Sequence, residues 1–288
     1  MRRPAACGGL NDQLKYSAMR RIIVVVLLLG VTIAYAQRYR GGGGRYRPAA
    51  RPAGVDDLTW EVDPHFKRDV FTFVRIRYQS TWRESWDTDW PDSDQNFSFR
   101  LQQLTSLKVN PEPVILELTD KELFNHPWIY IIEPGRLLFT DEEVIALRRY
   151  LLGGGFLMVD DFWGEDEWEN FHQQIKRVFP EKDPQELKLD HPIFNCVFRL
   201  DSKPQIPSIH HAMAAQGTGI TWERWDAQTP HYMGIEDDKG RLMVIICHNT
   251  DLGDGWEREG ENEYYFREFS EKKAYPMGIN IVFYAMTH

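Results

Sequence analysis

A helix and a strand follow one another directly in the stretch Thr140-Asp-Glu-Glu-Val-Ile-Ala-Leu-Arg-Arg-Tyr-Leu-Leu-Gly-Gly-Gly-Phe-Leu-Met-Val-Asp-Asp161. Thr140 begins the helix, because Glu143 three residues later completes a capping box. Apolar residues at helical spacing follow. The glycines 153–155 end the helix, since glycine readily takes the left-handed conformation found there. The apolar run 156–159 then predicts a buried strand that stops at two aspartates.

The same alternation continues on both sides of this stretch. Other apolar or β-branched runs predict strands, and periodic apolar residues predict helices. The predicted strands are 71–78, 128–132 and 242–246, and the predicted helices are 96–107, about 166–179 and 276–286. Buried strands that alternate with amphipathic helices indicate an α/β fold with a mainly parallel sheet covered on both faces.

Two segments carry a resemblance to a known family. They are Tyr150-Leu-Leu-Gly-Gly-Gly-Phe-Leu-Met-Val-Asp-Asp-Phe-Trp163 and Leu189-Asp-His-Pro-Ile-Phe194. With them the chain resembles, over about residues 71–288, the bacterial domain-of-unknown-function family 4159. The resemblance implies a class I glutamine amidotransferase-like fold, which is a flavodoxin-like three-layer sandwich with a mainly parallel sheet. It implies no reaction.

The position of the amidotransferase nucleophile differs from that fold's pattern. Those enzymes place a cysteine at the sharp turn after the central strand. Here the comparable turn holds Asp160, Asp161, Phe162 and Trp163. Because a carboxylate forms no thioester, glutamine amidotransferase activity is excluded.

The N-terminus has the pattern of a secretion signal. Arg20 and Arg21 precede an apolar run, and Ala34-Tyr35-Ala36 is a small-residue cleavage site. We therefore expect a signal peptide over 1–36, with Met19 as the true start, and export to the periplasm or the extracellular space. An uncleaved, membrane-associated anchor is the alternative.

A flexible arm is predicted over 37–54, because its glycines, prolines and five arginines bury little apolar surface. The arm could contact an anionic membrane surface. A single α/β domain is predicted over 55–288. That domain holds 24 Lys and Arg against 42 Asp and Glu, a net charge of −18. So acidic a surface repels phosphate backbones and excludes nucleic acid as a partner.

Candidate site residues are chosen by one rule, that open α/β sheets bind ligands beyond the carboxyl ends of their strands. The rule and the nearby histidines select Asp89, Trp90, Asp160, Asp161, His191, His248, Asn249, Asp251 and Asp254, with Glu133 after a further strand. Together these residues predict an acidic, aromatic rim.

Three interpretations of the rim compete. Asp160, Asp161, His191 and His248 could ligate a divalent metal, and Asn249, Asp251 and Asp254 loosely resemble a calcium loop. Tryptophans with paired carboxylates could bind or cleave carbohydrate. The carboxylates could instead be structural, with Asp160 and Asp161 capping the next helix.

The resulting hypothesis is a non-catalytic binding or scaffold module of the cell envelope, with an envelope protein or a glycan as partner. The alternative is a metal-dependent or carbohydrate-directed hydrolase that uses the acidic rim. No cofactor is predicted beyond a possible divalent metal. Cys196 and Cys247 lie in separate apolar runs, so two unpaired thiols are expected, with a disulfide as the alternative.

Overall fold

The computed structural model describes residues 60–62, 65, 69–81 and 85–288. The signal peptide predicted for 1–36 and the arm predicted for 37–54 lie outside these residues. Within the described part, none of the helices has the length and apolar character needed to cross a membrane. The helices are α2 Asp92–Leu104, α3 Asp141–Leu152, α4 Gly164–Val178, α5 Ile209–Ala214, α6 Leu252–Glu257, α7 Glu263–Tyr265 and α8 Tyr275–Thr287, with a π-helical segment Phe266–Ala274 between the last two and short 3-10 turns at Lys121–Asn125, Pro134–Arg136 and Pro192–Phe194.

Seven strands form one sheet in the order β3-β1-β4-β6-β9-β8-β7. They are β1 Val74–Ile76, β3 Val114–Leu116, β4 Trp128–Ile132, β6 Phe156–Asp160, β7 Gln185–Glu186, β8 His231–Glu236 and β9 Leu242–His248, while β2 Gln79–Ser80 pairs apart with β5 Leu137–Leu138. The strands β3, β1, β4, β6 and β9 are parallel to one another. At one edge of the sheet, β8 pairs antiparallel with β9, and β7 pairs antiparallel with β8. The prediction of an α/β fold with a mainly parallel sheet is confirmed.

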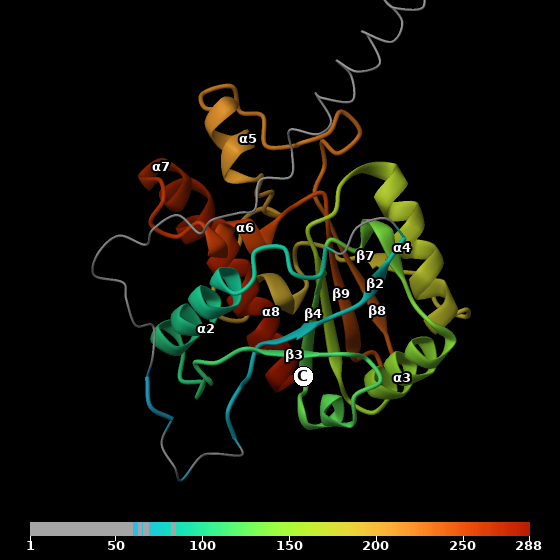
Figure 1. Cartoon of the computed structure of the whole chain (residues 1–288). Helices are drawn as coiled ribbons and strands as arrows, with labels where there is room; N and C mark the ends of the chain where they lie inside the picture. Colours follow the sequence, from blue (N-terminus) through green and yellow to red (C-terminus); the bar gives the residue numbers. More distant parts are fainter. Residues whose placement is uncertain (1–59, 63–64, 66–68, 82–84) are drawn as a thin grey trace, which may run out of the picture. The chain divides into compact units, whose positions relative to one another are not determined.

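Helices cover both faces of the sheet, an arrangement compatible with a three-layer sandwich (Figure 1). The helices α2, α6 and α8 pack on one face, and α3 and α4 pack on the other. The alternation of side chains along β4 serves both layers. Trp128 and Tyr130 enter the core beneath α2, α6 and α8, whereas Ile129 and Ile131 enter the core beneath α3 and α4.

The start of α3 confirms the predicted capping box. The Thr140 hydroxyl accepts from the Glu143 amide at 3.2 Å, and the Glu143 carboxylate accepts from the Thr140 amide at 2.7 Å. At the other end, Gly154 has a φ of 111°, a conformation that L residues with a side chain rarely adopt. These two local signals account for the agreement between the predicted and the observed helix.

Several elements were not predicted. The strand β3 is apolar but only three residues long, and β8 mixes polar and apolar residues, so neither gives a clear strand pattern. The last helix begins earlier than residue 276, because α7 and the π-helical segment run directly into α8. The segment that loosely resembles a calcium loop is a helix cap instead, since Asp251 Oδ1 accepts from the Asp254 amide at 2.7 Å where α6 begins.

Candidate functional site

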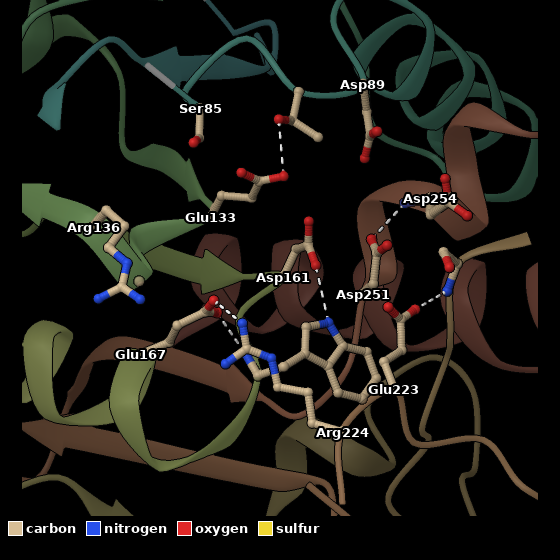
Figure 2. Close-up of a pocket in the computed structure, with 14 residues that line it drawn as sticks. Ser85, Asp89, Glu133, Arg136, Asp161, Glu167, Glu223, Arg224, Asp251 and Asp254 are labelled. Atoms are coloured by element: carbon tan, nitrogen blue, oxygen red, sulfur yellow. Dashed lines mark hydrogen bonds and ion pairs between the residues drawn. The ribbon is translucent and has the colours of Figure 1, made fainter. Parts of the chain in front are cut away.

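A cavity of about 410 Å³ opens at the carboxyl ends of the parallel strands (Figure 2). The loops after β1, β4, β6 and β9 supply most of its wall, and residues 208–224 supply the rest. The wall contains seven carboxylates and two arginines. The lining residues are Ser85, Thr88, Asp89, Glu133, Gly135, Arg136, Asp161, Trp163, Glu167, Ser208, Glu223, Arg224, Asp251 and Asp254. Open α/β sheets bind ligands at this position.

The cavity lies where consecutive connections change from one face of the sheet to the other. The helix α2 follows β1 and packs on one face, and α3 follows β4 and packs on the opposite face. Neighbouring strands whose connections leave in opposite directions have an open crevice at their carboxyl ends. The hydroxyl of Thr88 donates to Glu133 Oε1 at 3.0 Å across this crevice.

Buried Arg75 on β1 holds the loop that carries Asp89. Its guanidinium pairs with Asp94 of α2, with 2.5 Å between Nη2 and Oδ1. The Nη1 atom donates to the carbonyl oxygens of Trp86 and Thr88, at 3.0 and 2.7 Å. A fully buried charge is tolerated only when such partners surround it. Arg75 therefore fixes the geometry of the loop and does not line the cavity.

Three of the lining carboxylates stand on a left-handed backbone. The φ angles of Asp89, Glu133 and Asp161 are 62°, 46° and 56°. For a residue with a side chain this conformation costs about 1 kcal/mol or more, and such residues concentrate at functional sites. The hydroxyl of Tyr78 helps to hold one of them, because it donates to the carbonyl oxygen of Glu133 at 2.8 Å.

The carboxylates of the cavity disfavour one another's ionised forms. Burial, followed by the charges of neighbouring carboxylates, raises the pKa of Asp89, Asp161 and Asp251 well above the ordinary range. Burial also raises the pKa of Asp254, although Arg258 opposes the rise. Several carboxylates in one enclosed space do not all ionise near neutral pH unless a cation joins them.

Asp160 and Asp161 have separate environments. Adjacent residues at a strand end point in different directions, so Asp161 lines the cavity while Asp160 is fully buried and does not. Asp160 Oδ2 accepts from the Tyr130 hydroxyl and from the Gly253 amide, each at 3.0 Å. Burial raises the pKa of Asp160 to about 7, and these hydrogen bonds limit the rise.

His248 and Asn249 hold the start of α4 rather than lining the cavity. Asn249 Oδ1 accepts from the Gly164 amide at 2.9 Å, and His248 Nε2 donates to the Gly164 carbonyl at 3.1 Å. The suggestion that Asp160 or Asp161 caps this helix is therefore wrong. Burial lowers the pKa of His248 to about 4, so its imidazole is neutral at physiological pH.

The four-residue metal set predicted from the sequence is not brought together in the described chain. Only Asp161 of that set lines the cavity. The ring of His191 faces Tyr284 at 5.4 Å, and its Nδ1 accepts from the Ile193 amide at 3.2 Å. Trp90 also lies outside the cavity lining, with the Arg75 guanidinium 5.9 Å from its ring.

A different group of carboxylates could hold a cation. Three carboxylate oxygens, one from each of Asp89, Asp254 and Glu257, lie within 4.8 Å of one another. Asp89 Oδ2 is buried and accepts no hydrogen bond from any residue that the structure describes. Arg258 competes for this group, because its Nε lies 3.2 Å from Asp254 Oδ1 and 2.5 Å from Glu257 Oε2. The donor set, all carboxylate oxygen, fits calcium, magnesium or manganese.

Sequence reasoning missed part of the wall and one carboxylate of the possible cation group. The charged and aromatic residues that it missed are Arg136, Trp163, Glu167, Glu223, Arg224 and Glu257. Arg136 stands in the short 3-10 turn that follows β4, so the strand-end rule could have selected it. Glu223 and Arg224 come from an irregular segment whose sequence carries no periodic signal.

Cys196 and Cys247 are free thiols, as expected. Cys247 is buried in β9, whereas Cys196 Sγ lies 3.2 Å from the carbonyl oxygen of Asn280. Burial raises the pKa of both thiols. Neither lines the cavity.

Comparison with known proteins gives a family but no reaction. No curated protein matches the chain. The family model described as Domain of unknown function (DUF4159) matches residues 72–286. The matched range contains every strand of the sheet and every residue that lines the cavity. This chain therefore belongs to the DUF4159 family, as the motifs at 150–163 and 189–194 indicate.

Proposed function

We propose that this protein is an exported binding module of the cell envelope that holds a hydroxyl-rich ligand, such as a glycan, in the acidic cavity. The chemistry of the wall supports the proposal. Small-molecule sites are mostly apolar with a few polar groups, but this wall consists of carboxylates, guanidinium groups and hydroxyls beside one indole. Such a wall matches a ligand with many hydroxyl groups, because carboxylates accept hydrogen bonds and guanidinium groups donate them.

The size and rigidity of the cavity agree with this role. Its volume, about 410 Å³, falls within the range of about 300–1,000 Å³ usual for small ligands. Its carboxylates are already positioned: Asp161 Oδ1 accepts from Trp163 Nε1 at 3.2 Å, and Asp251 accepts from the Asp254 amide. A preorganised wall loses little entropy on binding.

The finer fold assignment belongs to the same proposal. The five parallel strands lie in the sheet in the order β3-β1-β4-β6-β9. If they are numbered 1 to 5 along the chain, this order is 2-1-3-4-5. This order is that of flavodoxin-like sheets, so we infer a flavodoxin-like, amidotransferase-like core. Asp160 and Asp161 stand where the nucleophilic cysteine of an amidotransferase would be, which favours a binding role over glutamine hydrolysis.

The cellular location rests on the sequence pattern of residues 19–36. Signal cleavage after Ala36 would release the module into the periplasm or the extracellular space. The five arginines of 37–54 would then place the acidic domain near an anionic membrane surface.

Binding of short neutral and N-acetylated oligosaccharides, measured by titration calorimetry, tests the proposal. Asp161→Asn is the informative variant, because asparagine tolerates the left-handed backbone and can still accept from Trp163, yet it removes the charge. We expect the parent to bind and the variant to bind about tenfold more weakly, a loss of about 1.4 kcal/mol. Asp238→Asn is the matched control, since Asp238 is 95% exposed and lies outside the cavity. Failure of the parent to bind any oligosaccharide would refute the proposal.

A metal-dependent hydrolase remains the second candidate, and the unpartnered oxygen of Asp89 beside Asp254 and Glu257 favours it. A cation at about 100 times its dissociation constant would stabilise the folded protein by about 2.7 kcal/mol. Thermal melts with calcium, magnesium, manganese and zinc should show this stabilisation in the parent and its loss in Glu257→Gln. The exposed Glu263→Gln is the control. Metal-dependent turnover of glycan or ester substrates would replace the binding role by the hydrolase.

A further inference from the structure

Trp225 is the most exposed of the large apolar side chains among the described residues, with 85% of its surface accessible. A single exposed apolar residue is ordinary on a protein surface and needs no explanation by itself. Trp225 differs from such residues because the segment that carries it also forms part of the cavity wall. The two residues that precede it in sequence, Glu223 and Arg224, line the cavity (Figure 2).

The segment around Trp225 is anchored to the body of the protein at almost every position. Glu223 Oε1 accepts from the Ser208 amide, and Arg224 pairs with Glu167, each at 2.5 Å. The remaining anchors are Asp226 Oδ2 to the Glu165 amide at 3.1 Å, the Ala227 carbonyl to Gln205 at 3.0 Å and the Thr221 hydroxyl to Gln205 at 2.7 Å. The backbone on both sides of Trp225 is therefore held in place, while the indole is exposed to solvent.

We propose that Trp225 is the aromatic platform of the cavity, on which a sugar ring of a bound oligosaccharide stacks. The inference rests on the proposed glycan-binding function and adds a second contact to it. Neighbouring Cα atoms are about 3.8 Å apart, so the backbone of Trp225 lies directly beside that of Arg224 in the wall of the cavity. An anchored backbone keeps the ordering cost of such a contact small.

The chemistry of this end of the cavity fits a sugar ring. A sugar ring has an apolar C–H face that packs on an aromatic ring and an edge of hydroxyls that carboxylates bind. An organic cation would also attract an indole. The seven carboxylates that share the wall with Arg136 and Arg224 would attract such a cation as well, so the test includes a cationic probe.

The test uses the oligosaccharide panel with Trp225→Ala, Trp225→Phe and a control, Ile145→Ala. Ile145 is 68% exposed and lines no part of the cavity. We expect Trp225→Ala to weaken the best-bound oligosaccharide at least about tenfold, Trp225→Phe to retain most of the affinity, and the control to bind as the parent does. Because Trp225 is exposed, unchanged melting temperatures should accompany these results.

The outcomes separate the two proposals. Binding that is lost in Asp161→Asn but unchanged in Trp225→Ala would overturn the platform and leave the glycan cavity standing. Absence of oligosaccharide binding in the parent would overturn both. A lysine-rich peptide serves as the cationic probe, and if Trp225→Ala weakened that peptide while no sugar bound, the ligand class would be wrong.

Discussion

Asp160→Asn isolates the cost of one buried carboxylate. Burial raises the pKa of Asp160 from 3.8 to about 7 in the folded state. Below about pH 4 the carboxyl is protonated in both the folded and the unfolded chain. The raised pKa therefore causes no loss of unfolding free energy in that range. As the pH rises, the unfolded chain ionises first, and stability is lost until the folded carboxyl also ionises near pH 7.

The pKa difference gives the size of this effect. A shift from 3.8 to about 7 corresponds to about 4 kcal/mol in total. Between about pH 5 and about pH 8 the parent should lose about 2.5 kcal/mol of unfolding free energy through this group. Asparagine does not ionise, so the variant should lack that loss.

The measured quantity is the difference in unfolding free energy between the parent and Asp160→Asn, followed as a function of pH. The asparagine side chain of the variant would keep an oxygen for the Tyr130 hydroxyl and the Gly253 amide, but its NH₂ group would replace Asp160 Oδ1, which has no hydrogen-bond partner among the described residues. A buried unsatisfied donor costs about 1–3 kcal/mol. That cost is the same at every pH, so it shifts the whole curve and not its slope.

Urea unfolding of the parent and Asp160→Asn at intervals from pH 5 to pH 8 measures the difference, with the exposed Asp238→Asn as the control. We expect the unfolding free energy of the variant to rise by about 2.5 kcal/mol relative to that of the parent between pH 5 and pH 8. Parallel curves for parent and variant would refute the reasoning, because they would mean that Asp160 is ionised in the folded protein throughout.

Two further predictions concern the helix cap and the domain boundary. Thr140→Ala should lower the unfolding free energy by about 1 kcal/mol, because it removes the hydroxyl that accepts from the Glu143 amide; urea unfolding of Thr140→Ser, which keeps the hydroxyl, should match the parent. Limited proteolysis of the purified protein, followed by mass analysis, should trim the chain to near Val55 and leave one resistant fragment; early cleavage within residues 140–180 would contradict the single domain predicted for 55–288.

The elements that sequence reasoning predicts well are those whose causes lie within a few residues. The capping box of Thr140 and Glu143, the glycines at 153–155 and the apolar strand β4 each depend on close neighbours in the chain. The rule that ligands bind beyond strand ends also needs no tertiary detail. It selected five of the residues that line the cavity, Asp89, Glu133, Asp161, Asp251 and Asp254.

Tertiary structure alone decided which carboxylates share a space and which are buried apart. Asp160 and Asp161 are adjacent in sequence, yet the pairing of β6 with its neighbours buries one and turns the other into the cavity. Glu223 and Arg224 reach the same wall from an irregular segment that contacts with residues distant in sequence, Ser208 and Glu167, help to hold in place. The raised pKa values follow from that assembly, because burial and mutual repulsion depend on distances between chain segments that no local pattern records.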